Sequence, residues 1–70
     1  MNLSEAKKGS SVQIIRIEGG FSIIKRLAEL GLYKGTKIHV ERNSTGPLIL
    51  NVLDSKLAVG RGQAKKIEVI

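Results

Sequence analysis

Few side chains in this sequence have the type and spacing that chemistry requires. His39 is the only histidine, and it alternates with Glu41 along an expected strand, so the two offer at most two metal ligands on one strand face. A tight Fe²⁺ or Zn²⁺ site takes three or four His, Cys or carboxylate ligands, and the chain has no cysteine. We therefore expect no cofactor and no structural metal site, with at most weak, adventitious binding of transition metals.

The carboxylates also fail to form a catalytic pattern. They are scattered singly along the chain, without the spacing of a general acid–base pair or of a nucleophile beside its base: Glu5, Glu18, Glu29, Glu41, Asp54 and Glu68. The sequence therefore predicts that the chain is not an enzyme.

The run Gly60-Arg61-Gly62 is the candidate for anion binding, because backbone N–H groups and a guanidinium both bind phosphate. Nucleotide-binding fingerprints need more glycines at set spacing between a strand and a full helix. The alternative is structural, with the glycines turning a corner while Arg61 covers the rim or caps nearby carbonyls. The shortness of the run favours the structural interpretation.

The overall charge points to an acidic partner. Twelve Lys and Arg against six Asp and Glu give a formal charge of +6, which attracts an acidic protein surface, a nucleic acid or an anionic membrane. The length of 70 residues predicts a single domain over residues 1–70. No apolar run suits a signal peptide or a membrane span. We expect a soluble, cytoplasmic protein without membrane insertion.

An amphipathic helix is predicted from Ile23 to Leu30. Ser22 is expected to cap its start, and Gly31 to end it in a left-handed conformation with Leu32 folding back on the last turn. Gly35 then suits the positive-φ position of a tight turn. The expected apolar face consists of Ile23, Ile24, Leu27, Ala28 and Leu30.

The rest of the pattern predicts short strands. They span residues 11–18, 36–42, 48–53, 56–59 and 67–70, with single helical turns at residues 3–7 and 63–66. Residues 54–55 turn the chain between the third and fourth strands. In the first strand, Val12 and Ile14 point one way while Ile15 and Ile17 point the other, so it contains a bulge or is covered on both sides.

One helix cannot supply the crossovers that a parallel sheet needs. The chain is therefore predicted to be mainly β, a small five-stranded antiparallel barrel with one amphipathic α-helix between the first and second strands. Closing such a sheet removes exposed edges that invite aggregation.

These features, in this order and spacing, resemble the FeoA family. Two departures are that Tyr33-Lys34 replaces a turn that commonly contains proline and that residues 54–55 form a plain, short hairpin. The residues that carry the resemblance are Leu3 and the turn to Gly9, Val12 to Gly20, Leu27 to Leu32, Gly35, Ile38, Val40, Gly46, Pro47, Leu57 to Arg61, Ala64, Ile67 and Val69.

The resemblance implies an SH3-like barrel that serves ferrous iron uptake as a small cytoplasmic accessory protein. Its implied partner is FeoB, a membrane permease for Fe²⁺ that carries a GTP-hydrolysing domain. Whether the chain activates or restrains that transporter, whether Fe²⁺ is the transported ion, and the oligomeric state stay open.

The expected contact surface is the outer face of the helix with its following turn. Positive charge there speeds docking on an acidic patch, and Tyr33 supplies an amphipathic ring. The alternative to a contact surface is an ordinary helix face that is exposed to solvent and binds no partner. The expected contact residues are Lys25, Arg26, Glu29 and Tyr33, with Arg61 as an outlier.

The competing function is that of a nucleic-acid-binding small barrel. The charge allows it, but single-strand binders stack bases on several exposed rings, and the chain has only Phe21 and Tyr33. We expect Phe21 to plug the core, and the basic residues are dispersed along the chain. A groove for proline-rich peptides is excluded for the same lack of aromatics.

Overall fold

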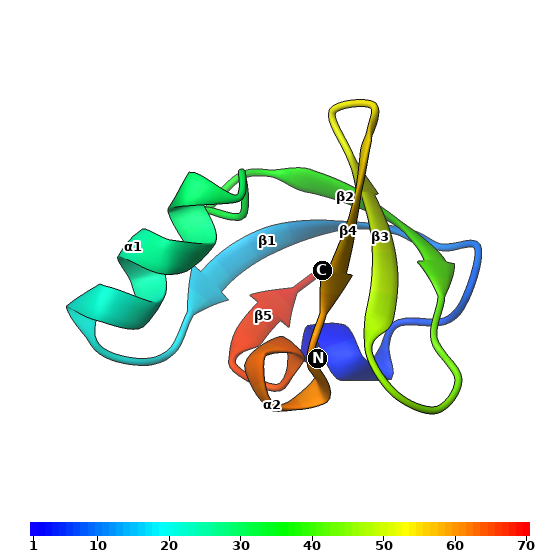
Figure 1. Ribbon diagram of the computed structural model, residues 1–70, viewed down its shortest axis with the longest axis horizontal. Helices are drawn as coiled ribbons and strands as arrows, with labels where there is room; N and C mark the ends of the chain where they lie inside the picture. Colours follow the sequence, from blue (N-terminus) through cyan, green and yellow to red (C-terminus); the bar gives the residue numbers. More distant parts are fainter.

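Alternating and β-branched residues fold five segments of this chain into one antiparallel sheet (Figure 1). The computed structural model describes residues 1–70, and the strands lie in the order β4-β3-β2-β1-β5. The elements are a 3₁₀ helix η1 (Leu3–Glu5), β1 (Ser11–Ile17), α1 (Phe21–Glu29), β2 (Lys37–Arg42), β3 (Leu48–Val52), β4 (Ser55–Val59), α2 (Arg61–Ala64) and β5 (Ile67–Val69). The predicted mainly β fold, with five antiparallel strands and its main helix between β1 and β2, is confirmed.

The alternation of apolar and polar residues places one face of each strand in a common core. In β2, Ile38 and Val40 are buried while Lys37 and His39 are exposed, as predicted. No buried side-chain nitrogen or oxygen lacks a hydrogen-bond partner. The core side chains are Leu3, Ala6, Val12, Ile14, Leu27, Leu32, Ile38, Val40, Leu48, Leu50, Val52, Val59, Ala64, Ile67 and Val69.

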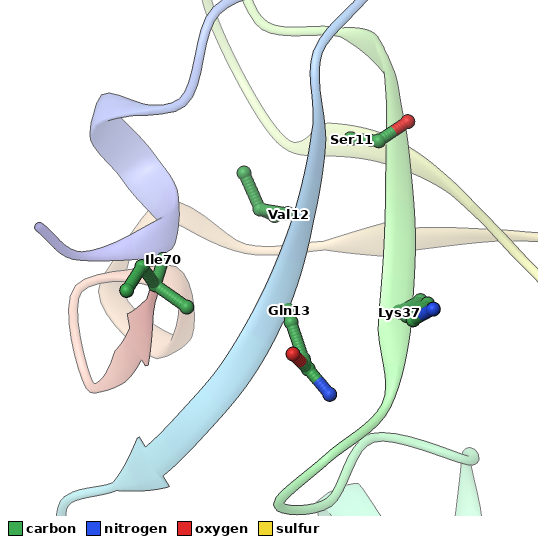
Figure 2. Close-up of a pocket in the computed structure, with 5 residues that line it drawn as sticks. All are labelled: Ser11, Val12, Gln13, Lys37 and Ile70. Carbon is green, nitrogen blue, oxygen red and sulfur yellow. The ribbon is translucent and has the colours of Figure 1, made fainter.

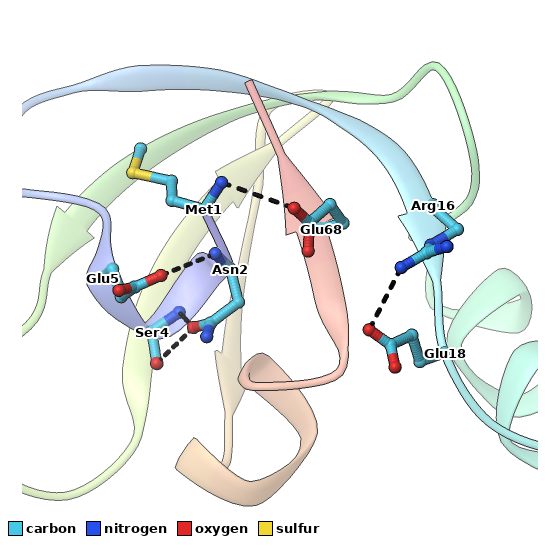
Figure 3. Close-up of polar contacts among 7 residues, drawn as sticks. All are labelled: Met1, Asn2, Ser4, Glu5, Arg16, Glu18 and Glu68. Carbon is cyan, nitrogen blue, oxygen red and sulfur yellow. Dashed lines mark hydrogen bonds and ion pairs between the residues drawn. The ribbon is translucent and has the colours of Figure 1, made fainter.

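The outer edge of β5 is covered by the N-terminus, as Figure 3 shows in part. Asn2 forms an antiparallel bridge with Glu68, and the Val69 N–H donates to the Met1 carbonyl over 2.9 Å. The terminal ammonium lies 3.4 Å from Glu68 Oε2. Asn2 also caps η1. Its N–H donates to Glu5 Oε1, and its side-chain oxygen accepts from the Ser4 N–H. The first residues of the chain therefore protect one end of the sheet.

A bulge reverses the parity of β1. Ile14 faces Val69 and Arg16 faces Glu68, so Ile15 is the extra residue on the β1 side. Val12 and Ile14 are buried, but Ile15 is 42% exposed. Of the two explanations that the sequence allowed, the bulge is confirmed.

The start of α1 differs from the prediction. The helix begins at Phe21, its N-cap is Gly20 and no side chain caps it, so the prediction of Ser22 as the cap was wrong. Gly20 is extended, with φ −77° and ψ 173°, and its carbonyl accepts from the N–H groups of Ile23 and Ile24 over 3.2 Å. The helix thus begins two residues earlier than predicted and ends one residue earlier, at Glu29, with Leu30 as C-cap.

The predicted apolar face of α1 is only partly buried. Leu27 is fully buried and Ile23 is half-buried, whereas Ile24 is 39% and Leu30 49% exposed. Figure 1 shows the reason, since α1 stands beside the end of β1 and does not lie across the sheet. A helix in that position covers the core along a narrow line and leaves its apolar flanks open.

The end of α1 follows the prediction. Gly31 has φ +90°, its N–H donates to the Ala28 carbonyl over 2.9 Å, and the N–H of buried Leu32 donates to the Leu27 carbonyl over 2.9 Å. This is a Schellman ending, in which glycine takes the left-handed position and an apolar residue packs back on the helix. Gly35, with φ +95°, then completes the predicted tight turn, closed by the Thr36 N–H on the Tyr33 carbonyl over 3.0 Å.

The hairpin between β3 and β4 carries unusual turn residues. Val52 faces Ser55, and the two residues between them, Leu53 and Asp54, both have positive φ, 51° and 65°. The turn therefore centres one residue earlier than the predicted residues 54–55. Positive φ at both central positions is the type I′ geometry, which favours Asn-Gly and is costly for a branched side chain such as Leu53.

Replacing the turn with Leu53→Asn and Asp54→Gly should stabilise the protein. We expect a gain of about 1 kcal/mol, because the new residues adopt positive φ with little strain. For a domain of this size that gain raises the midpoint of thermal unfolding by about 4–8 °C. Leu53→Ala is the control, since it removes the exposed side chain and keeps the strained backbone. Equal stability of both variants, measured by urea unfolding, would contradict the inference that the backbone of the wild-type turn is strained.

Candidate partner-binding surface

Four of the five predicted contact residues are exposed on α1 or in the turn that follows it. Lys25, Arg26 and Glu29 are exposed on α1, and none of them forms an ion pair. Lys25 and Glu29 lie on the side of the helix opposite buried Leu27, and Arg26 lies on its flank. Tyr33 follows in the turn after the helix and is 50% exposed. We call these four residues the outer helix face.

Arg61 lies elsewhere and is engaged within the fold. It begins α2 and is half-buried, and its Nη2 donates to Asn43 Oδ1 over 2.5 Å and to the Ser44 carbonyl. Asn43 in turn donates through Nδ2 to the carbonyls of Ser4 and Ala6 over 3.0 and 2.6 Å. Arg61 therefore caps carbonyls of the β2–β3 turn, as the structural interpretation of the glycine-rich run expected.

Phe21 is not a core plug. It is 80% exposed at the first position of α1, so the prediction that it fills the core was wrong. The early start of the helix carries Phe21 away from the sheet. Both aromatic rings of the chain, Phe21 and Tyr33, are thus on the surface.

Sequence reasoning missed an apolar hollow between β1 and α1. Its volume is about 300 Å³, and Tyr33 closes one side of it. A second hollow of about 300 Å³ lies on the other side of Tyr33 and reaches Leu53. The sequence signalled the parity change at Ile15, but it did not signal that α1 would lie beside this residue. The first hollow is lined by Ile15, Arg16, Ile17, Ile24, Tyr33 and Lys34, and we call it the β1–α1 hollow.

A smaller hollow of about 170 Å³ lies at the other end of β1 (Figure 2). Val12 and Ile70 supply its apolar lining, and Lys37 is the charged side chain beside Ser11 and Gln13. Gln13 Nε2 is already engaged, since it donates to the Gly35 carbonyl over 3.1 Å. This lining offers little to hold a ligand in one orientation.

His39 and Glu41 lie on the outer face of β2 as expected, but Glu41 has other partners. Its carboxylate accepts from Asn51 Nδ2 over 2.9 Å and pairs with Lys56 Nζ at 3.2 Å. His39 Nδ1 lies 3.3 Å from Ser11 Oγ. The chain contains no group of three His, Cys, Asp or Glu side chains placed to hold a metal ion.

A curved five-stranded antiparallel sheet with short helices at its connections is an SH3-like barrel, and its surface offers exposed cations and apolar hollows. None of its helices has the length and apolar composition needed to span a bilayer. This class of small barrel includes the domain whose sequence profile matches here over residues 1–70, the FeoA domain. The chain belongs to the FeoA family.

Two curated relatives are similar to this chain. A protein of Methanocaldococcus jannaschii, provisionally named Fe²⁺ transport protein A, is 40% identical over 67 residues, covering 96% of this chain and 82% of the relative. A Porphyromonas gingivalis protein, named a fusion of Fe²⁺ transport protein A and the Fe²⁺ transporter FeoB, is 34% identical over 71 residues. That match covers 99% of this chain and 8% of the fusion.

Solved structures agree with the fold. The crystal structure of an iron uptake regulatory protein, FeoA, superposes with a TM-score of 0.93 at 31% identity, covering 99% of this chain and 93% of that one. The zinc complex of FeoA from Stenotrophomonas maltophilia, described as a prokaryotic SH3 domain protein, gives 0.84 at 26% identity over 100% and 89% of the two chains. The resemblance to the FeoA family and the SH3-like fold predicted from it are confirmed.

Arg61→Ala should destabilise the protein by about 1–3 kcal/mol, because charge-assisted hydrogen bonds to Asn43 and Ser44 are lost in a partly buried place. Urea unfolding measures the loss. Arg42→Ala is the matched control, since Arg42 is exposed and forms no ion pair, and we expect a change below about 0.5 kcal/mol. Equal stability of the two variants would contradict the role of Arg61 in holding the turn.

Zn²⁺ should bind weakly, with His39 as its main ligand. Stabilisation by a ligand follows RT ln(1 + [L]/Kd), so we expect about 50 µM Zn²⁺ to add less than about 0.5 kcal/mol to the free energy of unfolding. Thermal unfolding with and without the metal checks this in the wild type and in His39→Ala. A rise of several degrees that His39→Ala removes would reveal a built site.

Proposed function

We propose that this chain is an accessory protein of Fe²⁺ transport that acts by binding the FeoB transporter, in the cytoplasm and without catalysing a reaction itself. The iron transport role is supported by the family and by the relative from M. jannaschii, which is 40% identical. The partner is supported by a different observation.

The single observation that carries the partner is the fusion in P. gingivalis. There, a segment 34% identical to nearly all of this chain belongs to the same polypeptide as FeoB. Joining two modules holds them at millimolar effective concentration, which favours modules that work in contact. A domain that is not fused to the transporter has to supply that proximity through its own affinity for it.

A binding partner changes a transporter only by preferring one of its states. If the chain binds one conformation of FeoB more tightly, the transporter shifts toward that conformation by the difference in binding free energy. Whether the favoured state is the more active or the less active one decides the sign of the regulation. The mechanism needs a docking surface and no reactive group.

The outer helix face is the proposed contact surface. Lys25 and Arg26 carry two of the twelve cationic side chains, both exposed and without an ion pair, and exposed Tyr33 follows in the turn after the helix. Cations at the edge of an interface speed association with an acidic patch, and an amphipathic ring adds contact area. Glu29 on the same face sets the orientation by pairing with a partner's cation. Arg61, which is engaged with the β2–β3 turn, contributes through the stability of the fold.

The double variant Lys25→Glu, Arg26→Glu tests this surface. We expect its affinity for purified FeoB, measured by calorimetry at low salt, to fall about tenfold, mainly through a slower association rate. The salt dependence of binding should also weaken, since screening acts on exposed charges.

The matched control is Lys65→Glu, Lys66→Glu, which makes the same change in charge at exposed positions after α2. An equal loss of affinity in both variants would show that only the net charge matters. Unchanged binding of the Lys25→Glu, Arg26→Glu variant would show that the outer helix face is not the contact surface. Absence of binding by the wild type would overturn the proposed function. A steep salt slope for RNA with none for FeoB would favour the nucleic-acid alternative.

A further inference from the structure

The β1–α1 hollow exposes several large apolar side chains in one place. Ile15, Ile24 and Tyr33 are 42%, 39% and 50% exposed, and together with half-buried Ile17 they form four of its six lining residues. Scattered apolar side chains are normal on a protein surface, but their convergence on one hollow marks a contact site.

The backbone produces this hollow, and no side chain of the protein fills it. The bulge leaves the side chain of Ile15 exposed, while Ile17 beyond it is half-buried and packs against the core. The register of β1 with β2 ends at Gln13, so no strand covers that side of β1 beyond the bulge. The turn after Gly31 then brings Tyr33 and Lys34 back to close the end of the gap between β1 and α1.

The apolar surface continues on both sides of the hollow. Phe21 lies one helical turn before Ile24 and is 80% exposed. On the other side, Tyr33 also borders the hollow that reaches Leu53, which is 81% exposed. A strip from Phe21 through Ile24 and Tyr33 to Leu53 thus crosses this face, with the hollow at its centre.

The charges around the hollow are mostly positive. Lys34 and Arg16 line it, and Lys37 lines the adjoining hollow beside Tyr33. Glu18 pairs with Arg16 at 3.3 Å, as Figure 3 shows, but both side chains are exposed and the pair is weak. The uncompensated charge comes from Lys34 and Lys37, which form no ion pair. Glu29 on α1 and Asp54 beside Leu53 oppose it at the margins.

The size of the hollow limits its occupant. About 300 Å³ is at the lower end of the range for small-molecule sites, which fix their ligands with a few well-placed polar groups. Here the polar groups are the flexible ends of Arg16 and Lys34 and the Tyr33 hydroxyl. A metabolite would find little to orient it, whereas one large apolar side chain would be well covered.

From this geometry we infer that the β1–α1 hollow is the socket for a large apolar side chain, such as Leu or Phe, on an acidic segment of the partner protein. The inference rests on the proposed function for the partner's identity and names the part of the surface that anchors it. An apolar anchor in a pocket carries most of the binding energy of an interface and slows dissociation. The cations around it select the acidic segment and repel a second copy of this chain, whose net charge is also +6.

The test compares two matched variants, one in α1 and one at the C-cap that follows it. Ile24→Gln removes the apolar wall of the hollow, and Leu30→Gln makes the same change at an exposed residue outside it. We expect Ile24→Gln to weaken binding to purified FeoB at least about tenfold and Leu30→Gln to change it less than about twofold. Circular dichroism and thermal unfolding establish that both variants fold.

Salt separates the socket from the outer helix face. The loss caused by Ile24→Gln should persist at high salt, where the effect of exposed charges is screened. If the wild type binds FeoB and Ile24→Gln behaves like Leu30→Gln, the socket is overturned while the proposed function stands. If Ile24→Gln instead abolishes self-association of the chain, the hollow is an interface between copies and the inference is wrong.

If the wild type does not bind FeoB, the proposed function fails. A peptide then tests whether the hollow binds an apolar side chain on an acidic segment. The probe is Glu-Asp-Glu-Phe-Glu-Asp-Glu, with the same peptide carrying Ala for Phe as its control. We expect amide shifts in nuclear magnetic resonance spectra around Ile15, Ile24 and Tyr33 that need the Phe and vanish in Ile24→Gln. Shifts that are absent, lie elsewhere or occur equally with the Ala peptide would overturn the socket.

Discussion

The reversal of side-chain parity in β1 is the constraint on which the rest of this structure depends. Before the bulge, Val12 and Ile14 are buried in the core, and the bulged residue itself, Ile15, is exposed to solvent. The extra residue bends the strand, which lets β1 pair with β2 over its first half and with β5 over its second. The same bend that curves the sheet into a barrel therefore also opens the hollow beside α1.

A sheet this small has little core to spare, so polar contacts at its margins matter. Without a cysteine, no disulfide ties the ends together. The N-terminal bridge between Asn2 and Glu68 covers β5, and the chain of hydrogen bonds from Arg61 through Asn43 to the carbonyl of Ala6 joins α2, the β2–β3 turn and the end of η1. The first contact covers the outer edge of β5, and the second ties the β2–β3 turn to both short helices.

The sequence predicted those parts of the fold that local chemistry decides. Strand alternation, the left-handed Gly31 and the parity change in β1 each have a strong local signal, and all three are confirmed. The prediction of where α1 starts was wrong because Gly20 and Ser22 can both serve as the N-cap of a helix. Tertiary packing selected Gly20. The exposure of Phe21 and the hollow beside β1 depend on where the helix stands against the sheet, which no local pattern encodes.

In the proposed docking, charge and apolar contact contribute in different ways, and the P. gingivalis fusion offers a useful comparison. A tethered domain is always near its partner, so a weak contact suffices. A domain that is not tethered to its partner has to find that partner and then stay bound. Cations such as Lys25 and Lys34 accelerate the encounter, but exposed charges do little to slow dissociation. A long residence time on the partner requires the burial of apolar surface. On this barrel, four apolar side chains converge at the β1–α1 hollow, among them Ile24 and Tyr33.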